Sequence, residues 1–103
     1  MKRYTLYIPE QMNDGRMISP SLLDEIEDSL LALTRGFTCT RGQGAWLGEG
    51  DRIYREPVRL YATDSENPAM LSRLEKLARE LRVTLQQEAI YLTHQEIGVS
   101  LVS

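Results

Sequence analysis

Residues 19–34 read SPSLLDEIEDSLLALT, and residues 67–81 read NPAMLSRLEKLAREL. Each stretch opens with a serine or an asparagine followed by a proline, a combination favoured where a helix starts. Leucine and isoleucine then recur at helical spacing, so each helix would have one apolar side. The sequence therefore predicts two amphipathic helices, one from Pro20 to Thr34 and the other from Pro68 to Leu81.

Segments rich in β-branched and aromatic residues lie before, between and after these helices. We expect strands over residues 3–8, 37–41, 53–62, 84–92 and 97–102, with a turn at 93–96 before the last one. Pro57 falls inside the third segment, and because proline cannot donate to a ladder, we expect regular pairing there to start at Val58. The order β-α-β-β-α-β, with one further strand, predicts a ferredoxin-like α+β domain with both helices on one face of an antiparallel sheet.

Length and charge narrow the class of protein. A chain of 103 residues fits a single domain over residues 1–103, and a net charge of −3 argues against a general nucleic-acid or anionic-membrane binder. No stretch is apolar for long enough to be a signal peptide or a membrane span. Cys39 is the single cysteine and His94 the single histidine, so we expect neither a disulfide within the chain nor a metal site. These features favour a cytoplasmic protein without a cofactor.

The alternation of the strands predicts a tyrosine-bearing sheet surface. We expect the aliphatic residues of the strands to face the helices, among them Leu6, Val58, Leu60 and Ile90. The opposite face would then carry an arginine and three tyrosines, namely Arg59, Tyr7, Tyr61 and Tyr91. Such a face is either a dimer interface or one wall of a ligand cavity between two sheets. RNA-recognition domains also present sheet aromatics, but the glycine–aromatic signature and the basic surface that they need are missing.

A glycine-rich stretch, GQGAWLGEG at residues 42–50, separates the second and third expected strands. It lacks the Gly-Lys-Ser/Thr ending of a phosphate loop and opens no helix, so we interpret it as the tip of a hairpin. Trp46 would either anchor this tip to the core or contact a partner together with Arg41 and Gln43, because loops on rigid sheets often carry function.

Two glutamates begin expected strands and are candidates for acid–base chemistry. Glu56 and Glu88 would each be either one half of a structural ion pair or a proton carrier with a raised pKa. For Glu88 the candidate ion-pair partners are Arg41, Arg55 and Arg82. Cys39 is expected to point into the core beside Phe37, and His94 to lie exposed in the turn at 93–96.

Four short motifs resemble a family of small bacterial proteins. They are Gly36–Thr38, Gly42–Trp46, Arg55–Val58 and Gln87–Leu92, and the resemblance covers residues 36–102. It implies a ferredoxin-like α+β fold and brings no established activity or catalytic residue.

Three functional hypotheses remain open. The first is a non-catalytic homo-oligomer, most simply a dimer, that binds a small molecule or a protein partner. The second is a cofactor-independent enzyme of the dimeric α+β barrel type, which would bind substrate between paired tyrosine faces and use Glu56 or Glu88 to move a proton. The third is a nucleotide or nucleic-acid binder that uses the arginines at 41, 52, 55 and 59.

Overall fold

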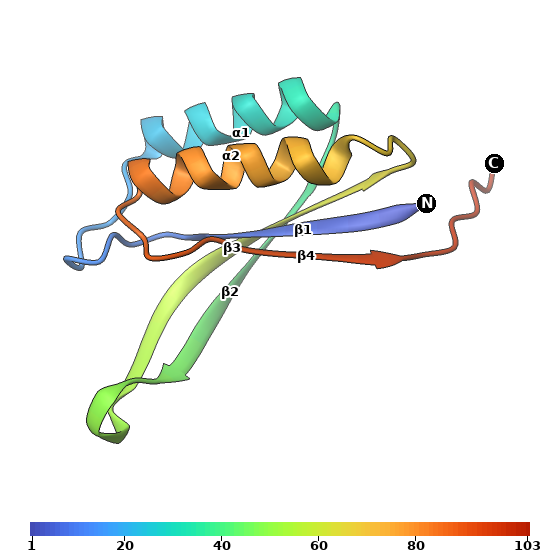
Figure 1. Ribbon diagram of the computed structural model, residues 1–103. Helices are drawn as coiled ribbons and strands as arrows, with labels where there is room; N and C mark the ends of the chain where they lie inside the picture. The colour runs from blue at the N-terminus through green and yellow to red at the C-terminus, as the bar shows by residue number, and fades with distance from the viewer.

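The computed structural model describes residues 1–103 as one four-stranded antiparallel sheet with two helices on one face (Figure 1). The strands are β1 (Lys2–Pro9), β2 (Thr38–Leu47), β3 (Ile53–Ser65) and β4 (Tyr91–Glu96), and the helices are α1 (Pro20–Thr34) and α2 (Met70–Thr84). A single 3₁₀ turn, η1 (Glu49–Asp51), connects β2 to β3. The sheet order is β2-β3-β1-β4. The predicted α+β architecture is therefore confirmed, with one strand fewer than expected.

Both helices are capped close to the predicted positions. Helix α1 starts at Pro20, and the Ser19 hydroxyl accepts the Leu22 N–H at 3.2 Å. Helix α2 starts two residues after Pro68, because the Asn67 side chain first accepts the Ala69 N–H in a turn. It continues to Thr84 rather than ending at Leu81, since Leu85 remains at helical spacing and is fully buried.

The core lies between the helices and the two middle strands. It is built from the inward residues of β1, the apolar sides of both helices and the loop residues next to them: Tyr4, Leu6, Ile8, Ile18, Ile26, Leu30, Tyr61, Met70, Leu74, Ala78, Leu81 and Leu85. Because β1 pairs on both sides, with β3 and with β4, its inward residues Leu6 and Ile8 are almost completely buried.

The strands around Pro57 are longer than the sequence suggests. Strand β2 runs on to Leu47 and β3 begins at Ile53, so Pro57 lies within a ladder opposite Gln43. The prediction that pairing starts at Val58 was wrong for this ladder. Proline is tolerated because β1 pairs with β3 only as far as Val58, so on that side Pro57 has no strand that needs its missing N–H.

The C-terminal part departs most from prediction. Residues 84–90 complete α2 and form a loop, and the expected turn at 93–96 is instead the second half of β4. Residues 97–102 have no regular secondary structure and no strand partner, so the predicted fifth strand is absent. Alternation alone could not locate β4, because β-forming residues also occur before it, at Val83 and Thr84, and after it, at Ile97 and Val99.

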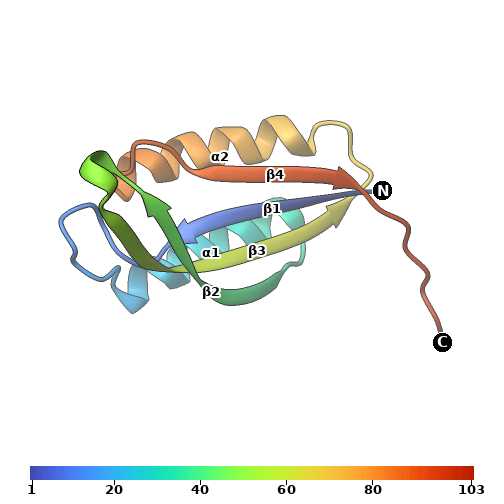
Figure 2. The ribbon, with the colours of Figure 1, turned by 90° about the horizontal axis from the view of Figure 1, so that it is seen from below.

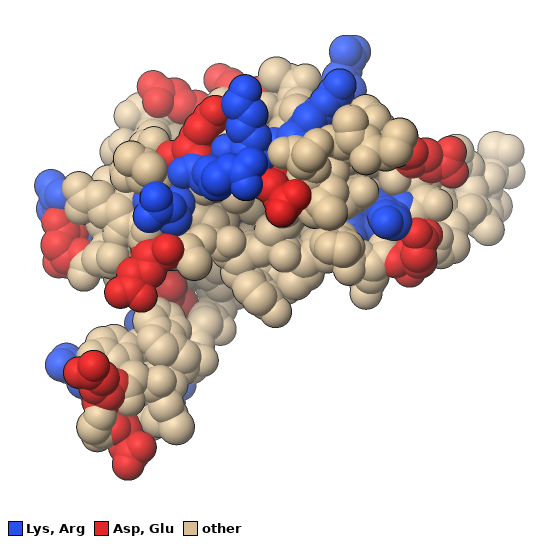
Figure 3. Space-filling view, viewed as in Figure 1, with Lys and Arg blue, Asp and Glu red and all other residues tan.

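The β2–β3 hairpin bends away from the helices and projects from the body of the domain (Figures 1 and 2). Figure 3 shows its end as a separate lobe that carries both acidic and basic side chains, and a group of basic side chains over the helical layer. Exposed basic residues of α2 are Arg73, Lys76, Arg79 and Arg82. No helix is long and apolar enough to span a membrane.

Candidate functional site

The pairing register decides which face each strand residue occupies. Tyr61 lies opposite Leu6 and Arg59 opposite Ile8, and directly opposed residues share a face. Tyr61 is 2% exposed in the core. The prediction that Arg59 and Tyr61 lie on the open sheet face was therefore wrong: β3 is shifted by one position relative to expectation, and both side chains point toward the helices.

The open face carries the remaining two predicted tyrosines. Tyr7 and Tyr91 are directly opposed on β1 and β4, with ring centroids 4.9 Å apart. Tyr7 is also opposed to Leu60, which shows that the aliphatic residues of β3 face outward. Strand β3 turns Arg59 and Tyr61 inward, opposite to expectation, because both side chains find carboxylate partners there.

Those partners are two glutamates. Glu10, which is 3% exposed and directly follows β1, accepts two hydrogen bonds of 2.9 Å from Arg41 and one of 2.9 Å from Arg59. Glu27 of α1 accepts a 3.2 Å bond from Arg59 and a 2.7 Å bond from the Tyr61 hydroxyl. Two carboxylates thus balance two guanidinium groups in one connected network.

The network shifts the pKa values of its members. The hydrogen bond from Arg41 is the main cause that holds the pKa of the Glu10 carboxyl below its ordinary value, with Arg59 adding to it against burial. Burial, followed by the bond to Glu27, raises the pKa of the Tyr61 phenol. Through these hydrogen bonds the network ties the hairpin strands to the end of β1 and to α1.

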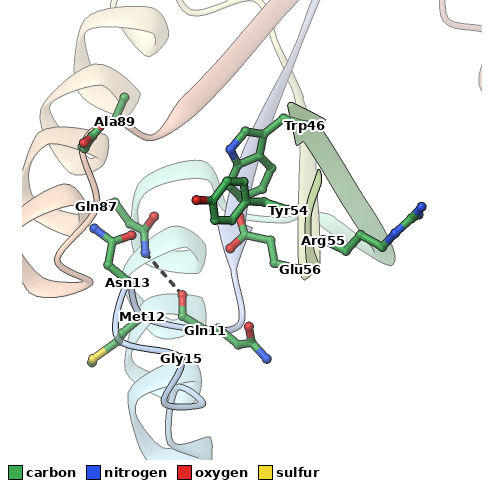
Figure 4. Close-up of a pocket in the computed structure, with 11 residues that line it drawn as sticks. Gln11, Met12, Asn13, Gly15, Trp46, Tyr54, Arg55, Glu56, Gln87 and Ala89 are labelled. Carbon is green, nitrogen blue, oxygen red and sulfur yellow. Dashed lines mark hydrogen bonds between the residues drawn. The ribbon is translucent and has the colours of Figure 1, made fainter. Parts of the chain in front are cut away.

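A cleft of about 530 Å³ lies beside the hairpin. Three segments line it: the loop after β1 (Gln11, Met12, Asn13, Gly15), the hairpin (Trp46, Tyr54, Arg55, Glu56) and the loop before β4 (Gln87, Glu88, Ala89). In Figure 4 the side chains of Trp46, Tyr54 and Glu56 face the two loops, whereas that of Arg55 points away. The cleft combines an aromatic wall with amide and carboxylate groups.

The aromatic wall is a stacked pair. Trp46 and Tyr54 are directly opposed on β2 and β3, with ring centroids 5.6 Å apart and planes inclined by 13°. The Arg52 guanidinium lies 5.2 Å from the Tyr54 ring centroid. At Gly48 an added Cβ would come within 2.3 Å of the Tyr54 ring, so the pair requires glycine there. Trp46 remains 49% exposed, which leaves its ring available to a ligand.

Glu56 is the carboxylate next to this wall. It is half-buried and makes no ion pair, and burial raises the pKa of its carboxyl. The other predicted glutamate, Glu88, lines the same cleft but lies exposed in a loop, not in a strand. Of the two alternatives for these glutamates, the structural ion pair is absent: neither contacts a basic side chain, Arg41 is bound to Glu10, and Arg55 points away from the cleft.

The two loops are joined at the base of the cleft. The Gln87 side chain donates to the Gln11 carbonyl at 3.3 Å, and the Asn13 side chain donates to the Gln86 carbonyl (Figure 4). Sequence reasoning missed these amides and Tyr54. The position of Tyr54 could have been found, since Trp46 and Tyr54 are equally distant from Gly50 in the hairpin; the loop amides have no such signal.

The other predicted residues lie outside the cleft. Gln43 is exposed on β2, and Arg41 is committed to Glu10. Cys39 lies on the helix side as expected but is exposed, not buried, because no helix covers the edge strand β2 there. His94 is exposed on β4 beside Tyr4 rather than in a turn. No group of three His, Cys, Asp or Glu side chains is placed to hold a metal ion.

Comparison with known proteins identifies similar folds. No family model matches the sequence, and no curated protein matches it. Among solved structures, a phage SAM lyase in complex with S-methyl-5'-thioadenosine is similar over 92% of this chain and 80% of its own, with a TM-score of 0.67 and 16% sequence identity. A phage SAM lyase in the apo state matches 91% of this chain and 78% of its own, with a TM-score of 0.67 and 12% identity. Likeness at such low identity shows that the fold is shared.

Proposed function

We propose that this protein is an enzyme that acts on an adenosyl sulfonium compound in the cleft beneath the β2–β3 hairpin. The observation that carries the proposal is the placement of Glu56, a half-buried carboxylate with a raised pKa, beside the stacked rings of Trp46 and Tyr54. The fold likeness to a phage SAM lyase in complex with S-methyl-5'-thioadenosine supports the choice of substrate class.

Each part of the cleft has a matching task. A purine ring stacks on an exposed indole, a contact worth about 1–3 kcal/mol per base in nucleic-acid-binding proteins. The amides of Asn13 and Gln87 are engaged with loop carbonyls through their N–H groups, which leaves their oxygens as acceptors for an exocyclic amine. The ionised Glu56 attracts the positive sulfonium centre, and this attraction is stronger near a partly desolvated carboxylate than in water.

The reaction that fits these groups is an elimination. Glu56 removes a proton from the carbon β to the sulfonium sulfur. The electron pair of that C–H bond forms a double bond between the α and β carbons, and the electron pair of the C–S bond moves to sulfur. The products are a neutral thioether and an alkene, and the proton rests on Glu56 until water removes it. A carboxyl with a raised pKa is a better base for this step than an ordinary one.

Turnover of SAM tests the proposal directly. Purified protein is incubated with SAM, and S-methyl-5'-thioadenosine is quantified by chromatography. Glu56→Gln should reduce the rate by at least about 100-fold, the usual contribution of a general base, with little change in the affinity for the uncharged S-methyl-5'-thioadenosine. Glu49→Gln is the matched control, since Glu49 lies on the same hairpin outside the cleft. Equal rates for Glu56→Gln and wild type would overturn the role of Glu56.

A second candidate is a binding module without chemistry, favoured by the 49% exposure of Trp46. It predicts binding of the nucleoside with no product formed. Binding without turnover would therefore select this candidate over the enzyme.

A further inference from the structure

Strand β4 is an edge of the sheet, and its outer side has no partner. Beside it, a groove of about 450 Å³ separates the strand from α2. Six of its eleven lining residues are apolar and come from both elements and the loop between them, and the other five are charged or polar side chains at its rim; the six are Leu71, Ala78, Ala89, Ile90, Tyr91 and Leu92. An open edge next to apolar surface is a ready template for another strand.

The segment that follows β4 is an unpaired strand former. Residues 97–102 read IGVSLV and have no regular secondary structure, and they leave the body of the domain in Figures 1 and 2. Leu101 is 97% exposed and Val102 is 92% exposed. Ile97 is still attached to the sheet, because its backbone N–H donates a 3.0 Å hydrogen bond to the Met1 carbonyl. Aliphatic side chains this exposed point to a partner surface.

We propose that β4 and residues 97–102 form one continuous edge strand that pairs, antiparallel, with the same stretch of a second copy. A register that sets Leu92 opposite Val102 places Ile97 of each copy at the two-fold axis. The contact is isologous, so it closes as a dimer with an eight-stranded sheet.

This register keeps the faces matched. Leu92 lies on the helix side of the sheet opposite Leu6, and Val102 of the second copy would join it over the groove. Leu101 would fall on the open face beside Thr93. The one charged residue in the paired stretch, Glu96, would face Gly98, and its carboxylate is already near Lys2 at 3.9 Å and the N-terminal amine at 3.8 Å.

The other places for this segment fit less well. The outer edge of β2 offers exposed threonines and no apolar groove. A turn at Ile97–Gly98 would let the segment fold back on its own β4, but Ile97 would then leave its bond to Met1. The dimer retains that bond and buries the same aliphatic residues.

Cysteine cross-linking tests the register. In a Cys39→Ser background, Ile97→Cys should form a disulfide between copies under mild oxidation, because Cα atoms directly opposed in a sheet lie about 4.5–5.5 Å apart. Gln95→Cys is the control: its counterpart in the second copy would lie roughly 13 Å away along the strand, too far for a disulfide. Cross-linking at 95 and not at 97 would contradict the proposal.

Sedimentation of the full chain provides the second measurement. The wild type should be a dimer, and Leu101→Lys should weaken dimerisation at least tenfold while leaving the thermal midpoint of the monomer unchanged. Val83→Lys is the matched control, since Val83 is an exposed aliphatic residue of α2 outside the groove. A monomeric wild type, or a dimer unaffected by Leu101→Lys and broken by Tyr7→Glu, would overturn the edge-strand interface.

Discussion

The Arg41 guanidinium binds the almost completely buried carboxylate of Glu10 through two hydrogen bonds of 2.9 Å. Glu10 also donates its backbone N–H to the Pro57 carbonyl at 3.0 Å, next to Glu56 in the chain. One residue therefore fixes both hairpin strands at the point where they leave the body. The placement of Trp46 and Glu56 against the two loops depends on this anchor.

Replacing Glu10, which anchors the hairpin, should lower the stability of the folded protein. We expect Glu10→Gln to lower the free energy of unfolding by about 2 kcal/mol, because it weakens three charge-assisted hydrogen bonds at a buried site. Asp64→Asn, which breaks the more exposed pair with Arg3, should cost less than about 1 kcal/mol. Urea denaturation of both variants measures the difference, and equal losses would contradict the anchor.

The same residue predicts a pH dependence. The pKa of Glu10 is lower in the folded protein than its ordinary value of 4.5, so its contribution is complete above pH 4.5 and is lost as the pH falls through the folded value. The stability gap between wild type and Glu10→Gln should therefore narrow in acid. Other lowered carboxyls, such as Asp64, are common to both proteins and cancel in the difference. A gap that stays constant from pH 7 to pH 3 would show that ionised Glu10 contributes nothing.

The buried Tyr61 should contribute more to stability through its hydroxyl group than the exposed Tyr91 does. Tyr61→Phe removes the 2.7 Å bond to Glu27 and leaves that half-buried carboxylate with one fewer donor, so we expect a loss of about 1–2 kcal/mol. Tyr91→Phe, on the exposed side of β4, should be neutral. Thermal unfolding separates the two, and a neutral Tyr61→Phe would mean that the hydrogen bond has no net value.

The stacking of Trp46 on Tyr54 should depend on the glycine at position 48. Gly48→Ala should push the Tyr54 ring off Trp46 and alter Trp46 fluorescence, because the new Cβ meets that ring. Gly44→Ala is the control, since its Cβ would meet only one backbone oxygen, at 3.9 Å. Identical spectra for both variants would contradict the stacked arrangement.

The helices and the fold class were predictable because they depend on local signals. Ser19 and Pro20 determine the start of α1 whatever the tertiary structure, and helical spacing marks the buried side. The strand phase was not predictable in this way. Hydrophobicity alone would bury Leu60, but the structure buries Tyr61, whose hydroxyl is satisfied by Glu27, a residue 34 positions away in the sequence.

The cleft was predictable only in part. Trp46, Glu56 and Glu88 were singled out from their types and positions, and all three line it. The residues opposite them come from loops whose approach depends on how β1 and β4 end. Arg59 and Tyr61 were assigned to a binding surface that the register of β3 with β1 turns inward.

The most direct test of the central proposal is a calorimetric titration of the protein with S-methyl-5'-thioadenosine. We expect saturable binding to one site per chain that Trp46→Ala weakens by roughly five- to hundredfold, the loss of one stacked base, while Leu47→Ala, on the adjacent exposed position outside the cleft, leaves it unchanged. Absence of binding at millimolar nucleoside, or equal affinity in Trp46→Ala and wild type, would contradict the assignment of this cleft.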